Sequence, residues 1–166
     1  MEDTSGNNVV FDLKDEAATI NLAREISNLA LTGDVIALFG DLGSGKTVFA
    51  RAFINARTIN YENVPSPTFT LLQTYEFPNP EGITPVYHFD LYRIESDKEI
   101  EELGMDDAFI DGISLVEWPE RLNDYLPNDR LDINFTHGDG ENRRQATVNF
   151  YGTWTSRKQS MANKYG

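Results

Sequence analysis

The sequence contains no cysteine, so disulfides, thiolate metal sites and cysteine nucleophiles are excluded. Basic residues are also scarce: 14 Lys and Arg stand against 27 Asp and Glu, giving a formal net charge of −13. This balance disfavours autonomous nucleic-acid binding, which depends on cations that neutralise phosphates. No apolar run approaches the roughly 20 residues that cross a bilayer, and the acidic, polar start is unlike a signal peptide. We therefore expect a cytoplasmic protein with no membrane partner.

What is present fits one domain, because a chain of 166 residues can bury a sizeable core without a covalent or metal staple. No composition shift or linker justifies two domains. We expect residues 1–8 to be a flexible lead, residues 9–152 to form the domain, and residues 153–166 to be a tail or short helix.

Most elements of this domain are predicted from the spacing of apolar residues. Continuous apolar runs indicate strands covered on both faces, and a period near 3.6 indicates helices. The sequence predicts helices over 15–31, 46–56, 96–103 and 120–126, strands over 35–39, 68–75, 86–91 and 113–116, a loop over 57–67 and a turn region over 78–85. Ser96 and Glu99 fit a capping box, and Gly104 ends that helix.

The pattern changes near residue 130. Leu131, Ile133 and Phe135 alternate with polar residues, and the same alternation recurs over 146–150 after a glycine-containing turn at 138–140. Alternation of this kind predicts an antiparallel hairpin with one solvated face.

A phosphate-binding motif lies between the predicted strand 35–39 and the helix that follows it. Residues 40–47 match G-x-x-x-x-G-K-[ST] in full. Glycines let backbone N–H groups point at phosphate oxygens, Lys46 adds a positive charge, and the Thr47 hydroxyl can ligate Mg²⁺. The predicted fold class is therefore α/β: a P-loop NTPase-like mixed sheet flanked by helices, with antiparallel strands toward the C-terminus. The residues expected to bind the phosphates are Asp41, Leu42, Gly43, Ser44, Gly45, Lys46 and Thr47.

A magnesium-dependent NTPase also needs a carboxylate at a strand end beside this loop. Asp90 and Glu117 each follow a mostly apolar run, so spacing alone does not choose between them. We expect one in the metal shell and the other near the attacking water. We interpret His88 as a structural residue, Trp118 as a core or pocket-wall aromatic, and residues 65–70 as a rigid turn rather than a switch segment.

Four segments together resemble one family: the loop 40–47, Ser-Pro-Thr-Phe at 66–69, His-Phe-Asp-Leu-Tyr-Arg at 88–93 and Val-Glu-Trp-Pro-Glu at 116–120. Their order and spacing over about residues 9–135 resemble the bacterial TsaE (YjeE) ATPases of tRNA threonylcarbamoyladenosine biosynthesis. The resemblance implies ATP hydrolysis with Mg²⁺. It also implies partnership with the TsaB–TsaD heterodimer, which modifies adenosine 37 of tRNAs reading ANN codons. The protein would then contact tRNA only indirectly, through this complex.

The resemblance also implies roles for individual residues. Thr47 and Glu117 would hold the metal, and Lys46 with the loop amides would hold the phosphates. Asp90 and Thr68 would lie at the hydrolytic centre. Glu16 would line the adenine pocket, because residues 14–19 resemble the stretch that lies near adenine in this family.

Three other functions compete with an ATPase. A small-molecule P-loop kinase would need an arginine-rich lid, yet the arginines are scattered and only Arg143 and Arg144 are adjacent. A GTPase is less consistent with the sequence, because the guanine-reading Asn-Lys-x-Asp motif is absent. A nucleotide-gated binding module without catalysis is the third alternative.

Overall fold

A computed structural model describes residues 7–58 and 62–165. Its strands are β1 Asn8–Leu13, β2 Val35–Phe39, β3 Leu72–Asn79, β4 Gly82–Asp90, β5 Ile113–Glu117, β6 Leu131–His137 and β7 Arg144–Phe150. Its helices are α1 Glu16–Leu29, α2 Lys46–Asn55, α3 Asp97–Glu102, α4 Met105–Asp111 and α5 Lys158–Tyr165, with 3₁₀ helices η2 Pro119–Tyr125 and η3 Gly152–Arg157.

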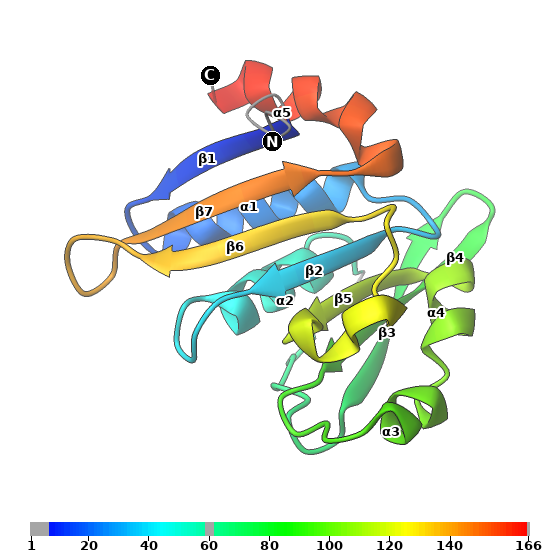
Figure 1. The fold of residues 1–166 in the computed structure, drawn as a ribbon. Helices are drawn as coiled ribbons and strands as arrows, with labels where there is room; N and C mark the ends of the chain where they lie inside the picture. Colours follow the sequence, from blue (N-terminus) through cyan, green and yellow to red (C-terminus); the bar gives the residue numbers. More distant parts are fainter. Residues whose placement is uncertain (1–6, 59–61, 166) are drawn as a thin grey trace.

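The seven strands form one mixed sheet in the order β1-β7-β6-β2-β5-β4-β3 (Figure 1). The pairs β6–β2, β2–β5 and β5–β4 are parallel, whereas β1–β7, β7–β6 and β4–β3 are antiparallel. Helices cover both faces of the central strands, with α1 and α2 on one side and α3, α4 and η2 on the other. The predicted fold class is confirmed.

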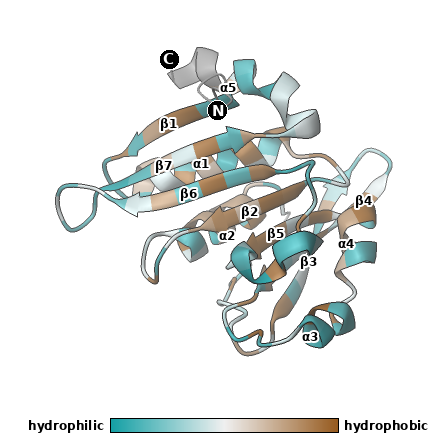
Figure 2. Cartoon of the chain, viewed as in Figure 1, coloured by the Kyte–Doolittle hydropathy of each residue, from teal (hydrophilic) through white to brown (hydrophobic). Residues whose placement is uncertain are grey.

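Two hydrophobic clusters occupy the two faces of the sheet. The larger one packs α1 and α2 against the sheet and includes Phe49, Phe53 and Phe150, all fully buried. The smaller one lies under α3, α4 and η2, over β4, β5 and the start of β2, and includes Phe89 and Val116. Figure 2 shows β2 and β5 as largely apolar, whereas polar and apolar residues alternate along β6 and β7. The central strands are thus covered on both faces, and the antiparallel strands on one.

The helix boundaries follow local signals in the sequence. Asp15 caps α1 by accepting a hydrogen bond from the Ala18 N–H at 2.9 Å. The capping box predicted at Ser96 is confirmed, with Glu99 accepting from the Ser96 N–H at 3.0 Å. Gly104 has a φ of 69°, so it ends α3 and also begins α4, a helix that the sequence analysis did not predict.

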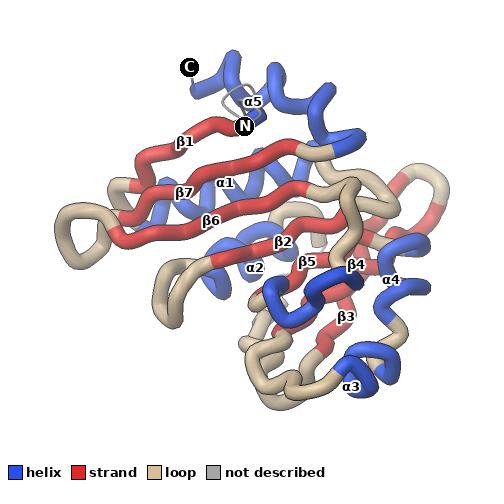
Figure 3. Tube along the Cα trace, in the orientation of Figure 1, coloured by secondary structure: helices blue, strands red, loops and turns tan. Residues whose placement is uncertain are grey.

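The turn region predicted over 78–85 is wrong, because two long strands leave only a tight turn between Asn79 and Gly82. Proline is compatible with both strands. Pro78 lies on β3, the edge strand, and Pro85 precedes the first residue of β4 that pairs with β5. The predicted strand over 68–75 starts too early, since residues 68–70 form a turn and β3 begins at Leu72. In Figure 3 the described parts of the connection from α2 to β3 are loop.

At the ends of the chain the sequence predicts a flexible lead over residues 1–8 and a tail or short helix over residues 153–166. Residues 1–6 of the predicted lead lie outside the described residues, but Asn8 already belongs to β1, the edge strand beside β7. After β7 the chain forms η3 and α5, and Trp154 is fully buried. Arg157 lies over the Trp154 ring and donates to both Asp34 carboxylate oxygens, at 2.6 and 3.0 Å. None of the described helices combines the length and apolar character needed to span a membrane.

Candidate functional site

The loop between β2 and α2 curves tightly at three glycines with positive φ angles, Gly40, Gly43 and Gly45. Gly40 has a φ of 146°, and a side chain there would come within 2.9 Å of the Phe135 carbonyl oxygen on β6. Gly45 has a φ of 114° and is the N-cap residue of α2. Because glycine has no side chain, it makes no side-chain hydrogen bond to the first turn of this helix. The first N–H groups of α2 therefore face the loop, in the arrangement that favours anions.

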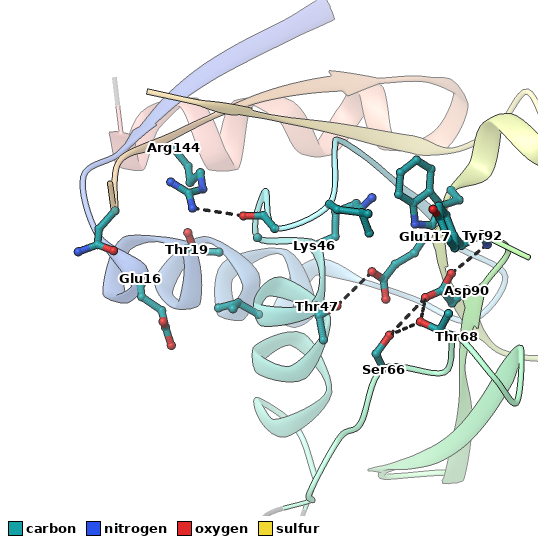
Figure 4. A pocket seen from close by; sticks show the side chains of 16 residues that line it. Glu16, Thr19, Lys46, Thr47, Ser66, Thr68, Asp90, Tyr92, Glu117 and Arg144 are labelled. Atoms are coloured by element: carbon teal, nitrogen blue, oxygen red, sulfur yellow. Dashed lines mark hydrogen bonds between the residues drawn. The ribbon is translucent and has the colours of Figure 1, made fainter. Parts of the chain in front are cut away.

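This loop forms one wall of a cleft of about 340 Å³. The cleft extends from the hairpin of β6 and β7 to the carboxyl ends of β4 and β5 (Figure 4). Of the residues that the sequence singled out, the cleft is lined by Glu16, Leu42, Gly43, Gly45, Lys46, Thr47, Ser66, Thr68, Asp90, Glu117, Trp118 and Arg144. Asp41 and Ser44 belong to the same loop but do not line it.

Lys46 is the first residue of α2 and is buried. Its ammonium group donates to the Gly40 carbonyl and lies 3.6 Å from the centre of the Trp118 ring. Burial lowers the pKa of Lys46, although the negative charges of Glu117, Glu120 and Asp90 act in the opposite direction. The interpretation of Trp118 as a pocket-wall aromatic is confirmed, since it lines the cleft beside this ammonium.

Asp90 and Glu117 are direct neighbours, because they pair at the carboxyl ends of the parallel strands β4 and β5. Glu117 faces α2, where the Thr47 hydroxyl donates to its Oε1 at 3.2 Å. A hydroxyl and a carboxylate are the oxygen ligands that Mg²⁺ takes from proteins, which usually supply only one or two ligands while phosphates and water supply the rest. The described residues contain no cluster of three or more His, Cys, Asp or Glu around a metal position. Thr47 and Glu117 therefore fit a nucleotide-bound Mg²⁺ rather than an all-protein metal cage.

Asp90 is buried and belongs to a separate hydrogen-bond cluster. Its Oδ2 accepts from the Thr68 hydroxyl at 2.8 Å and from the Ser66 hydroxyl at 3.3 Å, while its Oδ1 accepts from the Tyr92 N–H at 3.0 Å. The segment 66–70 is thereby tied to the end of β4. This geometry agrees with the interpretation of the segment as a rigid turn.

Glu16 lies at the opposite end of the cleft from Asp90, on the first turn of α1 (Figure 4). Arg144 lies on the same side of the loop and donates to the Gly43 carbonyl at 3.2 Å. From the sequence, Arg144 is recognisable only as one of two adjacent arginines. Its neighbour Arg143 forms an ion pair with Asp12 on β1 instead, at 2.9 Å.

His88, which the sequence indicates only as a structural residue, contacts the site from the interior. Its ring is fully buried, and its Nε2 lies 2.7 Å from Glu117 Oε2. The order of the motif 88–93 offered a signal, because His88 and Asp90 sit two residues apart and point to the same side of β4. The contact itself depends on the pairing of β4 with β5, so spacing alone did not reveal it.

The mixed sheet, the helices on both faces and the glycine loop between β2 and α2 define an α/β protein of the P-loop NTPase-like class. A family model described as "Threonylcarbamoyl adenosine biosynthesis protein TsaE" matches residues 13–146. The chain therefore belongs to the TsaE family.

Individual relatives agree with this assignment. The protein named tRNA threonylcarbamoyladenosine biosynthesis protein TsaE in Rickettsia bellii is 36% identical, and the match covers 84% of this chain and 94% of that protein. The protein of the same name in Bacillus subtilis is 39% identical, and the match covers 79% of this chain and 78% of that protein. The crystal structure of Bacillus subtilis YdiB superposes with a TM-score of 0.75 and 28% identity, and covers 96% of this chain and 97% of that one.

Proposed function

We propose that this protein is a Mg²⁺-dependent ATPase whose hydrolysis of ATP drives the TsaB–TsaD complex in threonylcarbamoylation of adenosine 37 of tRNAs reading ANN codons. One observation carries the proposal: the Thr47–Glu117 contact, 3.2 Å long, lines the same cleft as Lys46 and the buried carboxylate of Asp90. A phosphate loop, a metal-compatible oxygen pair and a second acid thus share one cleft.

In this proposal the loop amides and Lys46 bind the phosphates. The Lys46 ammonium donates a hydrogen bond to the Gly40 carbonyl and lies over the face of the Trp118 ring. Phosphate oxygens are stronger partners for an ammonium than either, since charge-assisted hydrogen bonds are about twice as strong as neutral ones. Thr47 and Glu117 would hold Mg²⁺, which neutralises charge that develops on the phosphates when it is bound.

Asp90 is the group that we assign to the attacking water. Its carboxylate is held by Tyr92, Ser66 and Thr68, so it is oriented before substrate arrives. An oriented carboxylate can accept the water proton or fix the water in line with the terminal phosphate. Thr68 orients Asp90 in this scheme, and Glu16 lines the adenine end of the cleft.

The partnership is proposed from the family and from charge. A net charge of −13 favours docking onto a protein surface over direct binding of tRNA, whose backbone is also anionic. The ATPase would then act on the modification complex while tRNA contacts the partner subunits.

The test is ATP turnover by the full chain, measured with and without Mg²⁺ and with and without the TsaB–TsaD pair. Lys46→Ala should lower turnover by about 100-fold or more, because phosphate-binding groups act mainly on the transition state. Lys98→Ala, which removes an exposed lysine from α3, is the matched control and should behave as wild type. Equal turnover by wild type and Lys46→Ala would refute the proposal. Thermal-shift titrations with ATP and GTP in Mg²⁺ test the base preference.

A further inference from the structure

His88 lies beneath the proposed metal-binding carboxylate and makes no direct contribution to the cleft. It is on β4, is fully buried, and pairs in register with Leu115 of β5. The cleft is lined by Asp90 and Glu117 but not by His88. Whatever His88 does for the site must therefore act through a neighbour.

That neighbour is Glu117, whose two carboxylate oxygens have different partners. Oε1 accepts the hydrogen bond from Thr47 on the cleft side, and Oε2 lies 2.7 Å from His88 Nε2 on the interior side. The Glu117 side chain is only 3% exposed, so water does not compete effectively for Oε2. The carboxylate is therefore held at both oxygens, and its rotation about the terminal bond is restricted.

The hydrogen bonds also indicate where the imidazole proton lies. His88 Nδ1 is buried and has no hydrogen-bond partner among the described residues. A buried N–H without an acceptor is destabilising, whereas a buried unprotonated ring nitrogen is penalised less. The arrangement therefore fits the neutral ring with its proton on Nε2, donated to Glu117.

We propose that His88 is a positioning residue: its Nε2–H holds Glu117 Oε2 so that Oε1 faces Thr47 and the metal. The inference rests on the proposed function, because it concerns the metal that accompanies the nucleotide. Hydrogen bonds from a second layer of residues orient metal ligands, and their loss typically weakens metal affinity by about 10–100-fold.

Metal affinity is measured through a fluorescent ATP analogue, by the Mg²⁺ concentration that gives half of the Mg²⁺-dependent change in binding. In His88→Leu this concentration should rise by about 10–100-fold, while binding without Mg²⁺ stays within about twofold. His88→Gln places an amide N–H near the Nε2 position and should remain within about threefold of wild type. If His88 only fills space, the half-saturating Mg²⁺ concentration of His88→Leu should be as low as that of His88→Gln, and this result would overturn the proposal.

A matched control comes from the adjacent strand. Ser114 on β5 is fully buried and its hydroxyl has no partner among the described residues. It pairs with Tyr87 and lies on the opposite face of the sheet from His88, so Ser114→Ala changes a buried position of the same two strands without touching Glu117. It should leave the half-saturating Mg²⁺ concentration unchanged. A shift in Ser114→Ala equal to that in His88→Leu would overturn the proposal, because the effect would then be general loosening of the sheet.

A second measurement needs no variant of the buried pair. The chain has two histidines, so ¹⁵N NMR of the imidazoles can be assigned with His137→Gln, which removes the exposed one. We expect His88 to be protonated on Nε2 alone, with a resonance that moves when Mg²⁺ is added to the nucleotide complex. Protonation on Nδ1 instead would overturn the proposal. If wild type binds the ATP analogue equally well with and without Mg²⁺, the proposed function is refuted. If binding depends on Mg²⁺ but His88→Leu does not change that dependence, only this inference is refuted.

Discussion

The parallel and antiparallel halves of the sheet contribute to this protein in different ways. The parallel half, β2, β5 and β4, is buried on both faces, and each of its strands ends beside the cleft. The antiparallel half consists of β6, β7 and β1, and it joins the parallel half through β6, which runs parallel to β2. It is packed against helices on one face only and reaches the cleft through the hairpin that carries Arg144. The first half holds the proposed chemistry, and the second half supports it.

Strand direction explains the difference. Parallel strands place their carboxyl ends at the same edge, so Asp90, Glu117 and the loop after β2 converge there. Antiparallel strands alternate in direction, so acids at their ends are spread over both edges. The buried acid Asp132 lies at the start of β6, which runs parallel to β2, so it is at the opposite edge of the sheet from the site and pairs with Arg130.

The largest expected effect comes from removing the charge of Asp90. Asp90→Asn keeps an acceptor for the Tyr92 N–H but removes the base, so ATP turnover should fall by about 100-fold or more while nucleotide binding persists. Asp132→Asn, the corresponding buried acid of the antiparallel half, should leave turnover of the folded protein unchanged. Single-turnover hydrolysis of both variants measures this. If Asp132→Asn lowers turnover as strongly as Asp90→Asn, the two halves do not differ as described.

The second prediction concerns the supporting half. Val148 on β7 is fully buried in the larger cluster, and Val148→Ala should lower the free energy of unfolding by about 2 kcal/mol through lost burial and a small cavity. Urea denaturation measures this loss. Turnover per folded molecule should equal that of wild type at temperatures where the variant remains folded. A lower turnover under those conditions would show that the antiparallel half also tunes the chemistry.

The third prediction concerns pH. Burial lowers the pKa of Lys46 in the free protein, and bound phosphates would raise it again. Nucleotide affinity should therefore be full below the lowered pKa and fall as pH rises through it, at a lower pH than an ordinary lysine would require. Loss of the ammonium should cost about tenfold in affinity. Isothermal titration across this range should show the alkaline decline in wild type, whereas the weak binding by Lys46→Ala should show none.

The smallest effect is expected where the antiparallel half touches the loop. Arg144→Ala removes a hydrogen bond to the Gly43 carbonyl and a positive charge beside the cleft, so nucleotide binding should weaken by about threefold. Arg143→Ala is the matched control, because Arg143 pairs with Asp12 away from the cleft. Equal effects of the two substitutions would assign the result to net charge rather than to contact with the loop.

Several parts of this protein were predictable because their signals are local. The strand 35–39, the capping box at Ser96 and the alternation over 131–150 each depend on residues within a few positions, and the structure confirms all three. The short helix after Glu117 was predicted as well, although it forms as the 3₁₀ helix η2. The strand β1 and the helix α4 were not predicted, because β1 is short and forms by pairing with the distant strand β7, and α4 has no side-chain cap.

By itself, the sequence determined the phosphate-loop residues, the two candidate acids and the α/β class, since motifs and periodicity are written in consecutive residues. Only the tertiary structure decided which groups meet. Thr47 and Glu117 are 70 positions apart, and Arg144 lies 101 positions beyond Gly43. Likewise, His88 meets Glu117 only because β4 and β5 are adjacent and parallel in the sheet. Strand order is chosen by the burial of the whole core, so no short stretch of sequence encodes these contacts.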